Sequence, residues 1–151
     1  MIPPAGIAPG KENLFYNESH HAWREELKKF VAKEIAPFVE EWEEAGEFPR
    51  ELYKKAGDFG LLGMGYPEQY GGTFEGIDIF HGIVTSEELA QGSGGIAASL
   101  LSLNISLPLI LALGTEEQKE KYITPVIAGD KIACLGAVSY THLRAHETMV
   151  D

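Results

Sequence analysis

The chain has 151 residues, which is enough for one domain with a single core. Its composition, 44% hydrophobic and 23% charged, is that of a globular protein and excludes the disordered, collagen-like and disulfide-scaffold classes. Twelve basic and 23 acidic residues leave a net charge of -11, so we expect no nucleic-acid partner. The single cysteine, Cys134, cannot form a disulfide within the chain, so nothing indicates an oxidising compartment. We expect a cytoplasmic protein.

The first half of the chain is predicted to be helical. Residues 1–16 contain no secretory signal and are interpreted as a loose leader. Apolar residues then recur every three or four positions over residues 18–45, which predicts an amphipathic helix. Because Pro37 lacks a backbone N–H, we expect this helix to kink near Ala36, and Gly46 is the expected end. A second short helix is expected from Pro49 onward.

A glycine-rich loop separates these helices from the next ones. Residues 61–76 hold five glycines and one proline, a density that predicts a structured loop. Helical spacing resumes over residues 77–90, pauses at the glycines of residues 92–95 and continues to Leu113. We expect Pro108 to bend this last helix.

The strongest local signal is a capping box near the carboxy-terminal end. The hydroxyl of Thr115 and the side chain of Gln118 are spaced to cap a helix that runs to about Ala128. Residues 131–137 are rich in apolar and small residues, and we interpret them as the start of a β domain. The predicted fold class is therefore all-α, followed by at most the first strand of a missing β domain.

One uncharged stretch has two interpretations. Residues 92–113 approach the length of a membrane span. Polar residues are spread along them, and glycines crowd their start, so we expect a buried core helix and no membrane span.

No catalytic constellation is found from the residues alone. His142 and His146 have the spacing of two metal ligands, but no third ligand has matching spacing, so we expect no metal site. The glycines of residues 92–95 resemble a phosphate cradle, although a join between two packed helices explains them as well. Glu87 and Glu88 lie in a mainly apolar helix, where we expect them to pair with a cation or a cap from elsewhere in the fold.

Three blocks of sequence resemble the amino-terminal helical domain of the acyl-CoA dehydrogenase family. The blocks are residues 34–37 with Trp42 and residues 45–49; residues 60–72 followed by residues 88–90; and residues 114–119 with Tyr122, Pro125 and residues 128–131. They fall between Asn17 and Gly136, and we assign residues 17–130 to this domain.

This resemblance implies a flavin enzyme. Members of the family use FAD to form a double bond between the α and β carbons of an acyl-CoA thioester and pass the electrons to an electron-transfer flavoprotein. They are usually homotetramers of a helical, a β and a second helical domain, and lie in the mitochondrial matrix in eukaryotes. Their catalytic base comes from the carboxy-terminal domain in most members, so no catalytic residue is assigned here.

The resemblance also implies a substrate pocket. In the family, the apolar helix before the Gly-Thr-Glu-Glu-Gln-Lys block lines the acyl pocket, which would place Ala98, Leu101 and Ile105 beside the fatty chain. Plain core packing is the alternative role for each of them.

The last residues depart from the family pattern. Val138 and Ser139 fit its flavin-contact positions, but Tyr140 stands where the family continues with Glu-Pro. Residues 138–148 resemble a translated sequencing adapter, so we expect residues 138–151 to be a non-native tail and the match at Val138 and Ser139 to be accidental.

Three functions remain open at this point. The first is a fragment of an FAD-dependent acyl-CoA dehydrogenase that is inactive by itself. The others are a fragment of a flavin acyl-CoA oxidase and a free-standing helical module that binds acyl groups or a protein.

Overall fold

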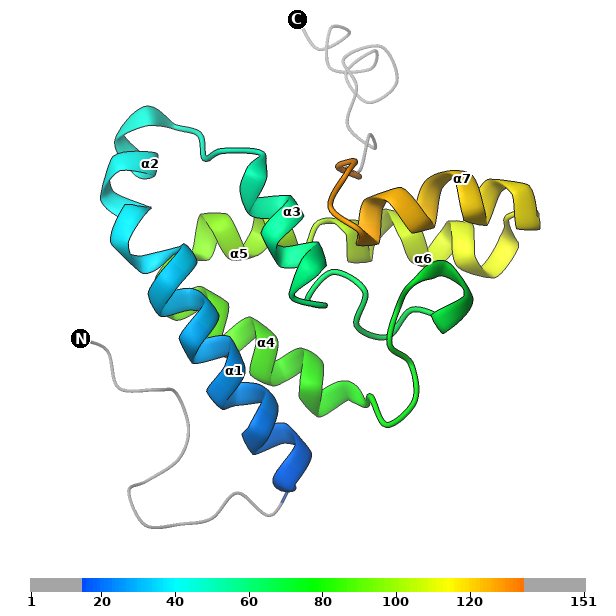
Figure 1. The fold of residues 1–151 in the computed structure, drawn as a ribbon, viewed down its shortest axis with the longest axis horizontal. Coiled ribbons are helices and arrows are strands. Elements are labelled where there is room, and N and C mark those ends of the chain that lie inside the picture. The colour runs from blue at the N-terminus through cyan, green and yellow to red at the C-terminus, as the bar shows by residue number, and fades with distance from the viewer. Residues whose placement is uncertain (1–14, 135–151) are drawn as a thin grey trace, which may run out of the picture.

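A computed structural model describes residues 15–134, and their regular structure is entirely helical (Figure 1). The elements are α1 (Glu18–Glu34), η1 (Ala36–Phe38), α2 (Val39–Ala45), α3 (Glu51–Asp58), η2 (Glu68–Tyr70), α4 (Ile79–Gly92), α5 (Gly94–Leu100), α6 (Leu103–Leu113) and α7 (Glu116–Ile127). The predicted all-α class is confirmed. Residues 131–134 have irregular backbone, and the rest of the predicted strand lies outside the described residues.

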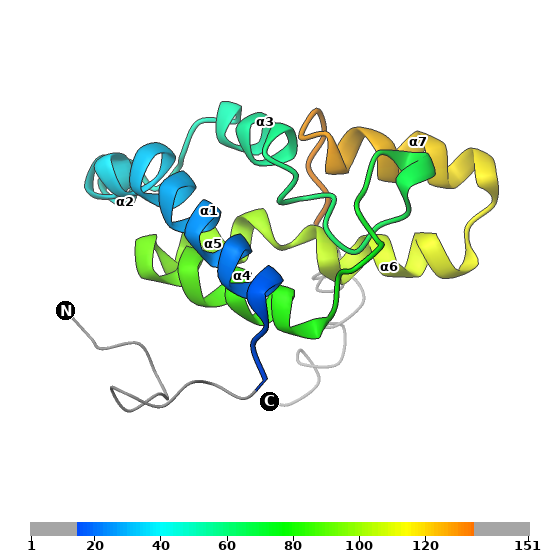
Figure 2. The same cartoon turned by 60° about the horizontal axis from the view of Figure 1, so that its bottom comes forward.

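The helices form two layers. Figure 2 shows α1, α3 and α7 above α4, α5 and α6. Within this arrangement α1 packs along α4, and α6 packs along α7. The core between the layers is built mainly from aliphatic side chains, and its fully buried members include Leu27, Ile35, Leu62, Val84, Leu89, Leu100, Leu107 and Ile123.

The expected interruption at Pro37 is confirmed. Helix α1 ends at Glu34, and Pro37 lies inside the short η1 that follows. Helix α2 then ends at Gly46, whose φ of 73° is the left-handed conformation that glycine adopts without strain. These breaks allow the chain to leave α1 and approach the core again through α3.

The apolar stretch before Leu113 differs from the prediction. It is two helices, α5 and α6, separated at Leu101 and Ser102, whereas Pro108 lies inside α6. The Ser102 hydroxyl lies 2.8 Å from the carbonyl oxygen of Ser99 and 3.0 Å from that of Ala133, contacts that compete with a continuous helix.

Only one face of this stretch is buried. By length and composition Gly94–Leu113 would be long and apolar enough to cross a membrane, but 28% of the window is buried inside the protein. The expected buried core helix is therefore buried on one face only, because no described residue covers the opposite face of α6. On that face Ile105, Leu109 and Leu113 are 61–78% exposed, and we call these three residues the α6 ridge.

Substitution of two helical glycines by alanine is expected to change stability in opposite directions. A Cβ at Gly57 would lie 2.5 Å from the backbone of Ala128, whereas a Cβ at Gly82 would meet no atom within 4 Å. We expect Gly57→Ala to lower the free energy of unfolding by about 1–3 kcal/mol, because α3 must move away from the end of α7. Gly82→Ala should raise it by about 0.5–1 kcal/mol through lower entropy of the unfolded chain. Urea denaturation measures both changes, and equal effects would contradict the close approach.

Candidate functional site

An apolar groove lies between α4, the loop after α3 and the junction of α5 with α6. Its volume is about 450 Å³. Its lining residues are Leu61, Met64, Ile79, Gly82, Ile83, Thr85, Ser86, Glu87, Leu101 and Asn104. The groove therefore has mainly aliphatic walls, and such a surface suits a hydrocarbon chain.

The structure places the three predicted pocket residues differently. Leu101 lines the groove and also packs against the core. Ala98 and Ile105 are exposed and do not line the groove. Plain core packing is therefore wrong for Ala98 and Ile105, and Ile105 instead belongs to the α6 ridge.

A tyrosine orients the one amide in the groove. The buried Tyr66 hydroxyl donates to Oδ1 of Asn104 at 3.2 Å. Burial raises the pKa of Tyr66 to about 12, because the phenolate form would lose its hydration. The two residues are 38 positions apart, so no local sequence signal indicates this pair.

The groove offers no free acid or base among its described lining residues. Its only acidic or basic side chain is Glu87, which pairs with Nη2 of Arg24 at 2.5 Å. The groove can bind and shield an apolar group, but these side chains do not provide a proton acceptor for catalysis.

An ion-pair network connects α1 with α4, as expected for Glu87 and Glu88. The Arg24 guanidinium donates to both carboxylates. Arg24 is 17% exposed and Glu88 is 4% exposed, so little water screens this pair. Burial opposes the charge on Arg24, but the hydrogen bonds that it donates to the two carboxylates outweigh burial, and the pKa of Arg24 is raised.

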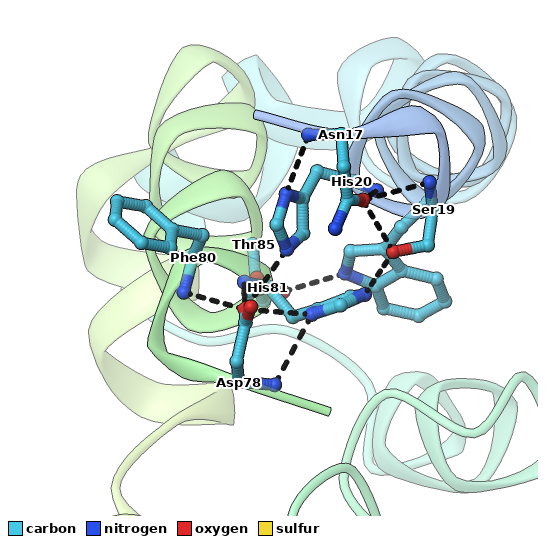
Figure 3. Close-up of polar contacts among 8 residues, drawn as sticks. Asn17, Ser19, His20, Asp78, Phe80, His81 and Thr85 are labelled. Atoms are coloured by element: carbon cyan, nitrogen blue, oxygen red, sulfur yellow. Dashed lines mark hydrogen bonds and ion pairs between the residues drawn. The ribbon is translucent and has the colours of Figure 1, made fainter. Parts of the chain in front are cut away.

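Helices α1 and α4 begin with equivalent capping boxes that meet in space (Figure 3). At the start of α1, the Asn17 amide donates to Nδ1 of His20, and at the start of α4 the Asp78 amide contacts Nδ1 of His81. The Nε2 of His20 then reaches Oδ1 of Asp78 at 2.9 Å. We did not predict these caps, because histidine is not the usual residue at the third helical position.

Asp78 is the central acceptor of this cluster. Burial acts to raise the pKa of its carboxyl group. Hydrogen bonds from the side chains of His81 and His20, and from the amides of His81 and Phe80, outweigh burial and lower this pKa to about 2. The carboxylate is therefore ionised throughout the physiological pH range.

The glycines of residues 92–95 do not fit a phosphate or a flavin. Helix α5 begins at Gly94, and its first turn is capped by the hydroxyl of Ser93. That hydroxyl lies 3.2 Å from Oε1 of Glu43, a carboxylate that would repel an anion at this position. The glycines join α4 to α5, in line with the helix-join interpretation. Val138 and Ser139, and also His142 and His146, lie outside the described residues.

The chain matches known proteins over most of its length. The family described as "Acyl-CoA dehydrogenase, N-terminal domain" matches residues 17–130. The mitochondrial long-chain specific acyl-CoA dehydrogenase of Rattus norvegicus is 40% identical over 132 residues, which are 87% of this chain and 29% of that protein.

Solved structures agree with this match. The acyl-CoA dehydrogenase of Geobacillus kaustophilus has a TM-score of 0.73 and 33% identity, over 80% of this chain and 31% of that one. The butyryl-CoA dehydrogenase of Megasphaera elsdenii has a TM-score of 0.71 and 29% identity, over 80% and 32%. A chain described under the electron transferring flavoprotein of Acidaminococcus fermentans has a TM-score of 0.70 and 33% identity, over 80% and 32%.

These matches identify the fold as that of the amino-terminal domain of acyl-CoA dehydrogenases. The chain belongs to the acyl-CoA dehydrogenase family, through its amino-terminal domain. It spans about 30% of the length of the curated relatives that it matches.

Removal of the arginine tests the network between α1 and α4. We expect Arg24→Met to lower the free energy of unfolding by about 3 kcal/mol, because it leaves Glu88 buried without its cation. Lys28→Met is the matched control on the same helix, since Lys28 pairs with Glu25 at the surface, and it should cost less than about 0.5 kcal/mol. Similar losses in urea denaturation of the two variants would contradict the assigned role of Arg24.

The raised pKa of Tyr66 predicts that the protein loses stability in alkali. Its pKa is raised from 10.0 to about 12, so its contribution is present below pH 10.0 and is lost as the pH rises towards 12. Denaturation across this range should show a loss on the order of 2 kcal/mol that Tyr66→Phe removes. Tyr122→Phe, which changes an exposed phenol, should keep the wild-type profile. An unchanged profile for Tyr66→Phe would be evidence against the buried phenol.

Proposed function

We propose that this chain is the amino-terminal domain of an FAD-dependent acyl-CoA dehydrogenase and that it forms one wall of the site for the acyl chain. The observation that carries the proposal is the uncovered apolar surface made by the groove and the α6 ridge. Exposed apolar surface of this extent on a helical domain is typical of a binding site or an interface. The family match gives the class of ligand, an acyl-CoA thioester.

The described residues contribute binding and not proton transfer. Leu101 and the α6 ridge would cover the hydrocarbon and exclude water, and each square ångström of apolar surface that they bury stabilises the complex by about 25 cal/mol. Asn104, held by Tyr66, is a fixed polar group at the edge of this surface. The rest of the enzyme would provide the base and the FAD, which accepts the hydride lost from the β carbon.

The finer assignments follow from the same proposal. We propose an electron-transfer flavoprotein as the electron acceptor and a homotetramer as the assembly of the complete enzyme. That Val138 and Ser139 match the flavin-contact positions only by accident stays a prediction, as does the cytoplasmic location, with the mitochondrial matrix as its eukaryotic equivalent. By itself the chain is expected to be inactive, because its described residues provide neither a base nor a flavin site.

A chimera tests this function. Residues 17–130 would replace the matching segment of the rat long-chain enzyme, with the rat enzyme itself as the reference. We expect the chimera to retain flavin and to oxidise a long-chain acyl-CoA, because the helical domain provides an equivalent wall. A folded chimera without flavin and without activity would contradict the proposal.

Variants of the chimera test the wall itself. Leu101→Glu and Ile105→Glu should each raise the KM at least about tenfold, because an unpaired carboxylate facing a fatty chain costs at least about 1.4 kcal/mol. Ala32→Glu is the control, because Ala32 is exposed on α1 and is not one of the residues that line the groove. An unchanged KM for both pocket variants would show that the acyl chain binds elsewhere.

A further inference from the structure

Two histidines and one aspartate form a compact set of potential metal ligands outside the groove. One donor atom from each of His20, Asp78 and His81 lies within 4.8 Å of the others. Oδ1 of Asp78 is 2.9 Å from Nε2 of His20 and 3.0 Å from Nδ1 of His81. Both histidines are buried, whereas the aspartate side chain is 48% exposed, so a small cation can reach the cluster from solvent.

We propose that this cluster binds a divalent transition-metal ion of the zinc class. The ligands would be Nε2 of His20, Oδ1 of Asp78 and Nδ1 of His81, with water in a fourth position. Tetrahedral zinc with bonds of about 2.0–2.1 Å separates its ligands by about 3.3 Å, so the observed spacings need to widen only slightly. Two imidazoles also disfavour calcium and magnesium, which prefer oxygen ligands.

The hydrogen bonds of His81 favour a cation here. Ser19 donates its hydroxyl hydrogen to Oδ1 of Asn17 at 2.6 Å, so towards Nε2 of His81, 3.4 Å away, it can only accept. When His81 is neutral and carries its hydrogen on Nε2, its Nδ1 accepts from the Asp78 amide at 3.3 Å and also faces Oδ1 of Asp78 at 3.0 Å. In this tautomer the lone pairs of Nδ1 and Oδ1 oppose each other at that distance, and a metal ion that replaces the amide hydrogen bond at Nδ1 would remove the repulsion. The Nε2–H then provides the outer hydrogen bond that metal-bound histidines usually make.

His20 must change its tautomer to bind the metal. Its Nδ1 now accepts from the Asn17 amide at 3.0 Å, so its hydrogen is on the Nε2 that faces Asp78. Metal binding moves this hydrogen to Nδ1 and ends the bond to the amide. Asn17 is exposed, so water can replace that bond. The side-chain half of the cap, from Oδ1 of Asn17 to the Ser19 and His20 amides, does not depend on the ring.

The expected role of the ion is to join two helix starts. His20 and Asp78 are 58 residues apart, and the metal would tie the first turn of α1 to the first turn of α4. A bound metal stabilises the folded state by a free energy that grows with the logarithm of its concentration divided by its Kd. This role is separate from the acyl surface, because none of the three ligands lines the groove.

Calorimetric titration of the tag-free 151-residue chain with Zn²⁺ near neutral pH, together with the Tm with and without the ion, tests the site. We expect one ion per chain and a Tm that rises on binding. His20→Gln and His81→Gln should each weaken binding at least about tenfold and abolish the rise in Tm. These variants should still fold, because glutamine at the third helical position completes a capping box as histidine does here.

Two controls separate this site from other histidines. His21→Gln changes an exposed neighbour on α1, and the double variant His142→Gln with His146→Gln removes the other spaced pair. Both should bind one ion as the wild type does. Loss of binding in the double variant, retention in His81→Gln, or a wild-type Tm that Zn²⁺ does not change would each overturn the proposal. The last result would mean that no metal ion joins these three side chains.

Discussion

The pairing of α1 with α4 is the interaction on which the rest of the described structure depends. Arg24 reaches across it to Glu87 and Glu88, and Nε1 of Trp23 donates to the hydroxyl of Thr85 at 2.8 Å. A half-buried arginine and a buried carboxylate fix the rotation of both helices, because each would lose its partner if one helix turned. One consequence is that the apolar faces of α1 and α4 meet in the core. Another is that Ile79 and Ile83 of α4 remain outside, beside the groove.

The exposed apolar surface follows from this arrangement. Helix α6 is mainly apolar, with Asn104 and Ser106 as its polar residues, and it buries Leu103 and Leu107 against the core while its ridge stays open. A complete small domain would place polar residues on that face. The composition of α6 is therefore typical of a helix that packs on the core with one face and has a binding surface for a ligand or a further chain on the other. The family membership and the span of about 30% of its relatives agree with this interpretation.

Local chemistry made part of the fold predictable from the sequence. Pro37, Gly46 and the Thr115–Gln118 box act within a few residues of their own position, and the structure has each feature as expected. The break before α6 was missed, because it depends on a contact between Ser102 and Ala133, which is 31 residues away. The clustering of Asp78 with the two histidines was missed for the same reason. Of the three predicted pocket residues, only Leu101 lines the groove in the structure. The other two were misplaced because periodicity alone does not show which face of an apolar helix is covered.

Hydrogen exchange tests most directly whether this chain is one domain of a larger enzyme. The amides of α1, α4 and α6 would be followed in the 151-residue chain and in the chimera with the rat enzyme. The account predicts that in the chain alone α6 exchanges faster than α1 and α4, and that only α6 gains strong protection in the chimera. If α6 is as protected as α4 in the chain alone, and the chain is a monomer that unfolds cooperatively, the surface needs no further domain. A free-standing helical binding module would then be the better account.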